Sequence, residues 1–89
     1  MPKRTDTNQA EIVKALRRVG AIVQDLHEVG KGCPDILVGY HGKNYLLEIK
    51  YQGGKLNERE KEWHADWRGQ VCTVWTPEQA IFAVMEVEG

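Results

Sequence analysis

The stretch DILVGYHGKNYLLEIK, residues 35–50, decides the fold because it predicts two β-strands joined by a tight turn. Both halves, DILVGY and NYLLEIK, are rich in β-branched, aromatic and other apolar residues, and HGK between them is typical of a hairpin connection. Side chains alternate between the two faces of a strand, so Glu48 and Lys50 share one face of an otherwise apolar strand. We therefore ask what lies opposite this carboxylate and ammonium.

The pairing of the two strands indicates the answer. If the turn holds two or four residues, we expect Tyr40 to pair with Tyr45, which places Asp35 opposite Lys50. Directly paired residues point to the same side of a sheet, so Asp35, Glu48 and Lys50 come together at one end of the hairpin. A turn with an odd number of residues would put Asp35 on the other face unless a bulge corrected it.

Such a group of side chains has a recognisable chemistry. Two neighbouring carboxylates repel one another, and partial burial makes the repulsion worse. A hard divalent cation removes it, since Mg²⁺ is usually held by one or two carboxylates together with waters and substrate phosphates. The ammonium of Lys50 is placed to orient a water or to neutralise charge on a phosphate. Asp35, Glu48 and Lys50 therefore predict a site for phosphodiester hydrolysis.

The rest of the chain predicts helices and strands around this hairpin. The class is α/β, with a small mixed four-stranded sheet flanked by helices on both sides. A right-handed crossover through the second helix should leave the third and fourth strands parallel. The expected order is a flexible basic arm over 1–6, a helix from Thr7 or Asn8 to 19, a strand from 21, the hairpin, a helix from 58 capped by Asn57 and Glu60, a strand over 70–76 and a last helix from Pro77.

Length and composition set limits on what the chain is. Its 89 residues suffice for one domain, which we assign to 1–89. With 42% hydrophobic and 28% charged residues the composition is that of a soluble globular protein, and no signal-peptide or membrane-spanning pattern is expected. A net charge of −1 argues against a passive, strongly basic nucleic-acid binder. Cys33 and Cys72 form no CxxC pair and are expected to be free thiols.

Glu11 is a further candidate for the site. On a helical wheel it falls at the edge of the apolar stripe that contains Ile12 and Leu16. From that edge it can lean over the end of the sheet toward Asp35 and Glu48. The alternative is a solvated glutamate near a helix N-terminus, which the helix dipole favours.

Other residues are candidates for contact with DNA or with a second copy of the chain. Flexible glycines followed by a lysine suit close approach to a phosphate backbone, although a plain loop before a helix explains them equally well. These candidates are Gly53, Gly54, Lys55 and Lys31. Trp63 and Trp67 lie four residues apart on the second helix, where they either pack into the core or form a dimer interface.

Taken together, these residues resemble a known group of nucleases. Gly-Cys-Pro-Asp at 32–35 followed by Glu-Ile-Lys at 48–50 looks like the motif of the PD-(D/E)xK nuclease superfamily, and the expected αβββαβ order is similar to its common core. More narrowly, GCPDILV … YLLEIKYQGGKLNEREKEW resembles the VRR-NUC family, especially its short stand-alone members of phages and bacteria. The resemblance extends from Glu11 to about the last helix.

The resemblance implies an activity and a site. It implies a Mg²⁺- or Mn²⁺-dependent endodeoxyribonuclease with the restriction-endonuclease-like fold. It assigns Asp35, Glu48 and the backbone carbonyl of Ile49 as metal ligands, Lys50 as the catalytic lysine, and Glu11 as an accessory acid near the metal. The family often has a glutamine early in the following helix. This chain has Glu60 there, and Glu60 is not assigned to the site.

The resemblance also implies a substrate and an assembly. Branched DNA such as a Holliday junction is the expected substrate, as in DNA repair, and a homodimer is the expected working unit. The expected location is the cytoplasm of a bacterial cell or of a phage-infected host. Two alternatives stay open: a catalytically inactive nucleic-acid-binding module, or a dimeric interaction module, each on the same fold.

Overall fold

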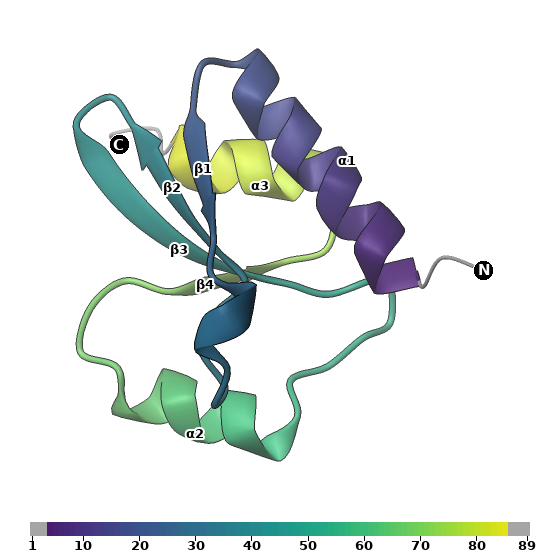
Figure 1. The fold of residues 1–89 in the computed structure, drawn as a ribbon, viewed down its shortest axis with the longest axis vertical. Helices are drawn as coiled ribbons and strands as arrows, with labels where there is room; N and C mark the ends of the chain where they lie inside the picture. Colours follow the sequence, from purple (N-terminus) through teal and green to yellow (C-terminus); the bar gives the residue numbers. More distant parts are fainter. Residues whose placement is uncertain (1–3, 86–89) are drawn as a thin grey trace.

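A computed structural model describes the chain over residues 4–85, and its side chains from residue 8 onward. The elements follow the order expected for an αβββαβ core with a C-terminal helix (Figure 1). They are α1 (Arg4–Arg18), β1 (Ile22–Asp25), the short 3₁₀ helix η1 (His27–Val29), β2 (Ile36–Tyr40), β3 (Lys43–Ile49), α2 (Glu58–Asp66), β4 (Cys72–Val74) and α3 (Pro77–Val84).

The four strands form one mixed sheet in the order β1-β2-β3-β4. β1, β2 and β3 are antiparallel neighbours, whereas β3 and β4 run parallel, as the crossover through α2 requires. The predicted α/β class and the mixed four-stranded sheet are therefore confirmed. None of the helices in the described part of the chain is long and apolar enough to cross a membrane.

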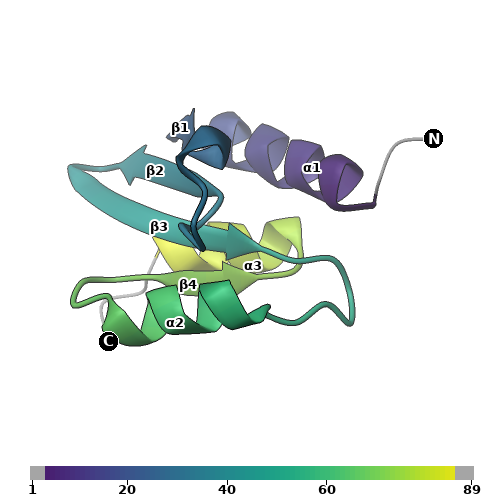
Figure 2. The same cartoon turned by 60° about the horizontal axis from the view of Figure 1, so that its bottom comes forward.

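The core lies on one face of the sheet. α1 and α3 contact each other and cover this face, and α2 lies on the other side of the molecule (Figures 1 and 2). The buried side chains come from both helices and from alternate positions of the strands, as period-two alternation requires. They include Ile12, Leu16, Ile36, Val38, Tyr45, Leu47, Ile49, Val74, Ala80 and Val84.

The hairpin register differs from the expected one by two residues. Tyr40 pairs with Lys43, not with Tyr45, because only His41 and Gly42 form the turn. Both turn residues have positive φ, 50° and 81°, which is typical of the two-residue turns that match the twist of a hairpin. The expected pairing of Asp35 with Lys50 is therefore wrong. Since the shift is an even number of residues, every side chain keeps its predicted face.

The beginning of α1 also differs from the prediction. The helix begins at Arg4, before the Thr7 or Asn8 expected from the capping residues. Residues 4–6 of the arm predicted to be flexible are thus helical, and residues 1–3 of that arm lie outside the described part of the chain.

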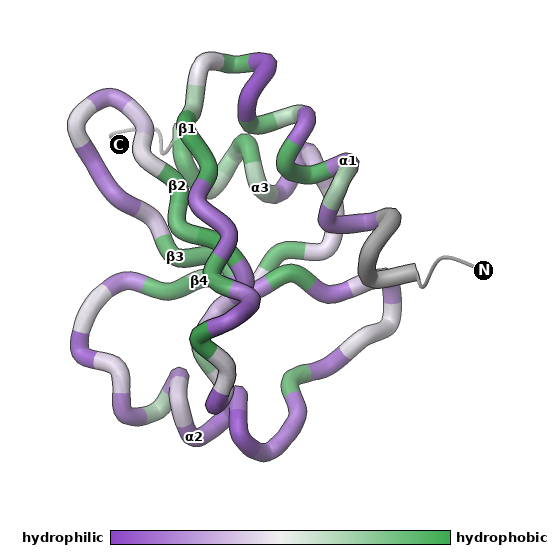
Figure 3. Tube along the Cα trace, in the orientation of Figure 1, coloured by the Kyte–Doolittle hydropathy of each residue, from purple (hydrophilic) through white to green (hydrophobic). Residues whose placement is uncertain are grey.

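α2 is attached to the sheet without contributing to the core. None of its residues is buried, and most of them are hydrophilic (Figure 3). The predicted capping box is present, with the Asn57 side chain accepting a hydrogen bond from the Glu60 N–H at 2.9 Å. Trp63 and Trp67 stack on each other with ring centroids 4.5 Å apart, and Trp67 is 43% exposed. Neither ring enters the core, so the core-packing interpretation is wrong.

Candidate active site

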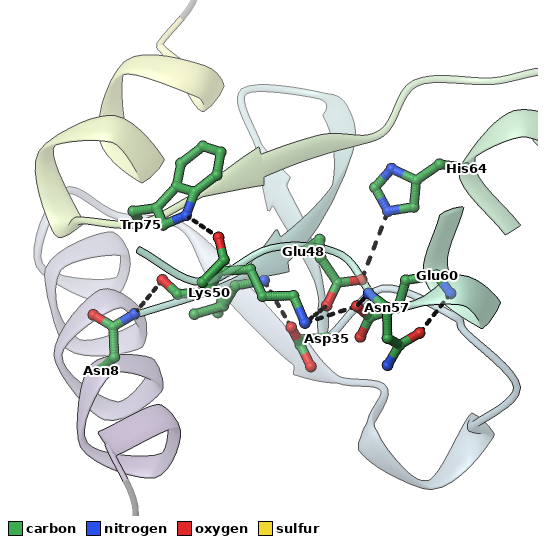
Figure 4. A network of polar contacts seen from close by, with 10 residues as sticks. Asn8, Asp35, Glu48, Lys50, Asn57, Glu60, His64 and Trp75 are labelled. Atoms are coloured by element: carbon green, nitrogen blue, oxygen red, sulfur yellow. Dashed lines mark hydrogen bonds and ion pairs between the residues drawn. The ribbon is translucent and has the colours of Figure 1, made fainter. Parts of the chain in front are cut away.

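Asp35 and Glu48 meet at one end of the hairpin, on the face of the sheet that α2 covers (Figure 4). Asp35 directly precedes β2, and its backbone N–H donates to the carbonyl of Leu47 at 3.1 Å. Its carboxylate oxygen Oδ2 accepts a hydrogen bond from the Ile49 N–H at 2.7 Å. Ile36 pairs with Leu47, so the same register continued by one residue places Asp35 opposite Glu48. The two carboxyl groups are therefore held together by the backbone of β3.

Lys50 lies beside this pair. Its Nζ is 3.9 Å from Oε2 of Glu48 and 2.7 Å from Oε1 of Glu60. Its backbone is fixed as well, because its N–H donates to Val74 at 3.0 Å and its carbonyl accepts from the Asn8 side chain at 2.7 Å. The predicted grouping of Asp35, Glu48 and Lys50 is thus present in the structure.

Two residues of α2 join the group, although the sequence pattern alone does not point to them. Glu60 forms the short ion pair with Lys50, and His64 places Nε2 3.6 Å from Oε1 of Glu48. The sequence does contain one indication of them. Glu60 and His64 are four residues apart on the helix that follows the Glu-x-Lys strand, so their side chains share one helical face. Glu60 therefore has two roles, since it also completes the capping box with Asn57.

The electrostatics of Glu48 are unusual. Only 2% of its side chain is exposed. This burial, followed by a hydrogen bond with Asp35 and the nearby charges of Asp35 and Glu60, raises the pKa of Glu48 to about 9 despite the opposing effect of Lys50. In the metal-free protein Glu48 is therefore protonated at neutral pH.

The two α2 residues are shifted in the other direction. Burial alone would raise the pKa of Glu60, but the hydrogen bonds from Lys50 and from the Asn57 backbone outweigh it and lower that pKa. Burial lowers the pKa of His64, against the raising effect of Glu60. Glu60 is thus ionised and His64 neutral near pH 7, which leaves Lys50–Glu60 as the ion pair of the site.

The carboxyl pair fits a hard divalent cation. Burial beside Asp35 keeps Glu48 protonated at neutral pH, and a cation held by the two carboxyl groups would supply the positive charge that this proton now supplies. Over residues 8–85, whose side chains the structure describes, no three His, Cys, Asp or Glu side chains are arranged as a ready-made metal site. A Mg²⁺-type site needs only one or two carboxylates, because waters and substrate phosphates complete it. Asp35 and Glu48 provide that number.

The accessory candidates lie farther from this group. Glu11 is exposed on α1 and lines a hollow with Asn8, Gln52 and Gly53, and no described contact joins it to Asp35 or Glu48. Its role as an accessory acid stays a prediction, as does the metal-binding role of the Ile49 carbonyl.

The DNA-binding candidates lie in two loops: Lys31 in the loop between η1 and β2, and Gly53, Gly54 and Lys55 in the loop between β3 and α2. Lys31 and Lys55 are exposed, and Gly53 has a φ of 82°. Gly54 is fixed in place, because its N–H donates to Tyr51 at 2.7 Å and its carbonyl accepts from the indole of Trp75 at 3.0 Å. Their contact with DNA stays a prediction.

Fold and site together define a small α/β domain with a carboxylate pair and a lysine at one end of its sheet. Comparison with solved structures identifies the fold: the chain has the fold of a structure described as "VRR_NUC domain", with a TM-score of 0.76 and 21% sequence identity over 96% of this chain and 98% of that one. None of the family models or curated proteins that were compared matches the sequence. The likeness confirms the fold expected from the motif.

Proposed function

We propose that the chain is a divalent-metal-dependent endonuclease that hydrolyses phosphodiester bonds in DNA. The observation on which the proposal depends is the buried carboxyl pair of Asp35 and Glu48 beside the ammonium of Lys50. A surface ion-pair network does not require a carboxyl group that is 98% buried, since exposed ion pairs stabilise a fold only weakly. Likeness to a VRR_NUC domain supports a nuclease on this fold.

In this proposal the residues divide the chemistry between them. Asp35, Glu48 and the Ile49 carbonyl hold Mg²⁺ or Mn²⁺. The bound cation supplies Lewis-acid activation of a water and stabilises charge on the phosphate. Lys50, whose Nζ lies 3.9 Å from the Glu48 carboxyl, assists the attacking water and helps to neutralise charge on the phosphate. Glu60 holds Lys50 in place, and Glu11 assists from α1.

The substrate and location are proposed from the family resemblance. Branched or junction DNA is the proposed substrate, with phosphate contacts from Lys31, Lys55 and the glycine pair Gly53-Gly54. We place the activity in the cytoplasm of a bacterial cell or a phage-infected host.

Cleavage of labelled DNA tests the proposed activity. Four-way junction, flap, duplex and single-stranded DNA are incubated with the protein in Mg²⁺, in Mn²⁺ and in EDTA. We expect cleavage of at least one substrate that EDTA abolishes. Asp35→Asn and Lys50→Ala should each lower its rate by about 100-fold or more, as removal of a charge that stabilises the transition state does.

Lys61→Ala is the matched control for Lys50→Ala. Lys61 is 59% exposed and pairs with Glu58 on the surface of α2, so its removal should leave the rate unchanged. Absence of metal-dependent cleavage on every substrate would contradict the proposal, and binding without cleavage would favour the inactive nucleic-acid-binding module. Unchanged rates in both Asp35→Asn and Lys50→Ala would show that the site is assigned wrongly.

A homodimer is the proposed working unit, and an apolar surface on α3 supports it. Phe82 is 71% exposed and Met85 48% exposed. Beside Phe82 lies a hollow lined by Val74, Trp75 and Ala83 at the β4 edge of the sheet. We expect light scattering to give the mass of a dimer for the wild type and of a folded monomer for Phe82→Asp. A monomeric wild type at concentrations that cleave DNA would contradict the dimer.

A further inference from the structure

The spacing of residues on α2 matches the spacing of residues on β3. Residues four apart on a helix share a face and are separated by about 6 Å along its axis. Residues two apart on a strand share a face and are separated by about 6.6 Å. Glu60 and His64 can therefore meet Lys50 and Glu48 at the same time, and they do, at 2.7 Å and 3.6 Å (Figure 4).

The second of these contacts is incomplete. Nε2 of His64 and Oε1 of Glu48 face each other, both are buried, and neither has a hydrogen-bond partner among the described residues. Their separation of 3.6 Å exceeds that of a hydrogen bond, whereas buried polar groups are nearly always paired. Closure by about 0.6 Å would convert this contact into a normal N–H···O bond.

We propose that His64 is a positioning residue for Glu48: its Nε2–H donates to Oε1 when the Glu48 carboxylate holds a cation. Oε2, which lies 3.9 Å from Nζ of Lys50, is then left for the cation. This inference rests on the proposed function, because it concerns the same metal site. Carboxylates that bind metals are usually hydrogen-bonded in turn, and loss of such a partner typically weakens metal binding by 10- to 100-fold.

The attachment of α2 allows this closure. No residue of α2 is buried, so its position depends on polar contacts and on the loop before Pro34 and not on the core. A shift of a few tenths of an ångström at His64 therefore requires no repacking of the apolar side chains beneath the sheet. The Lys50–Glu60 ion pair holds the other end of the same helical face.

Binding of Mn²⁺ measured by electron paramagnetic resonance tests the inference without DNA. We expect His64→Leu, which keeps bulk but has no donor, to raise the dissociation constant by about tenfold or more. His64→Gln, which retains an amide donor, should stay within about threefold of the wild type. His27→Leu is the matched control, because His27 is exposed and belongs to η1, and it should bind as the wild type does. Circular dichroism confirms that each variant is folded.

A measurement on the wild type needs no variant. Nitrogen-15 NMR of the imidazole should show Nε2 of His64 protonated, with its proton slowly exchanging once Mg²⁺ is added. An unprotonated Nε2 in the Mg²⁺-bound protein would overturn the inference, as would a His64→Leu protein that binds Mn²⁺ like the wild type. Coupling of Mn²⁺ to a histidine nitrogen would make His64 a ligand and would also overturn it. If the wild type binds no Mn²⁺, the proposed function itself fails.

Discussion

Replacing Glu48 with glutamine is expected to abolish metal-dependent cleavage and at the same time to stabilise the metal-free protein. Glutamine has nearly the shape of a protonated glutamate, so it fits the buried position beside Asp35 without a charge. It cannot hold a divalent cation as a carboxylate does. Residues of functional sites often lower the stability of the fold while being required for activity, and we expect Glu48 to be such a residue.

The pH dependence of this effect follows from the raised pKa of Glu48. Its pKa is about 9 in the folded protein and 4.5 ordinarily, so the folded state binds more protons than the unfolded state between these values. The stability that protonated Glu48 contributes is complete below pH 4.5 and is lost as the pH rises through about 9. Near pH 9 we therefore expect Glu48→Gln to be more stable than the wild type by roughly 2–4 kcal/mol, and near pH 5 by much less.

Urea unfolding of the metal-free proteins from pH 5 to pH 9 measures this difference. Glu62→Gln serves as the control, because Glu62 is exposed on α2. Its stability should follow that of the wild type at every pH. Added Mn²⁺ should stabilise the wild type and not Glu48→Gln, since only a protein that binds the ion gains from it. A Glu48→Gln protein that is less stable than the wild type at pH 9 would contradict a buried, repelled carboxyl group.

The second large effect is expected at Gly32, where α2 approaches the loop before β2. Gly32 has a φ of 85°, which costs a residue with a Cβ about 1–2 kcal/mol. That Cβ would also lie 2.5 Å from the backbone oxygen of Arg59 and 3.2 Å from Cβ of Trp63. Gly32→Ala can relieve this clash only by moving α2 and this loop apart, which adds roughly 1–3 kcal/mol. Since α2 supplies Glu60, cleavage should fall as well.

Gly30→Ala separates the two contributions. Gly30 has a φ of 67°, but nothing lies within 4 Å of the position of its Cβ. Its ψ of −162° places it in a backbone region that is essentially restricted to glycine, so we expect the variant to lose about 1–3 kcal/mol from backbone strain alone and to keep α2 in place. Hydrogen exchange should show the α2 amides exposed in Gly32→Ala and protected in Gly30→Ala. Equal protection of α2 in both variants would mean that the close approach does not hold this helix.

In the hairpin, strand alternation predicts the face on which each side chain lies but not the register of the two strands. The faces of Asp35, Glu48 and Lys50 depend only on parity, so they follow from the sequence for any turn with an even number of residues. The register itself depends on the turn, and the favoured signals for a two-residue turn are Asn-Gly or Asp-Gly. His41 with a φ of 50° is not one of these, so the sequence offers no basis for choosing the shorter turn.

The residues of the site likewise divide into those that local sequence rules bring together and those that depend on tertiary packing. Asp35, Glu48 and Lys50 belong to one hairpin, so local rules bring them together. Glu60 and His64 reach the site only because α2 crosses the face of the sheet opposite the core. Their placement depends on how a mostly polar helix docks, and no hydrophobic stripe on α2 indicates which face will meet the sheet.

Glu11 illustrates the limit of a helical wheel. Ile12 and Leu16 direct α1 onto the core face of the sheet, where Ile49 points, whereas Glu48 points to the opposite face. A side chain at the edge of the α1 stripe must therefore reach around the end of the sheet. The wheel gives its direction from the helix axis but not the distance to Asp35.

Anomalous diffraction from a crystal soaked in MnCl₂ tests the central claim most directly, because it locates the ion without reference to activity. We expect one anomalous peak between the carboxyl groups of Asp35 and Glu48, about 2.1 Å from an oxygen of each. The peak should be absent from Asp35→Asn crystals treated in the same way. Ordered wild-type crystals without density at this position, or with Mn²⁺ bound only elsewhere, would contradict a metal site formed by these two residues.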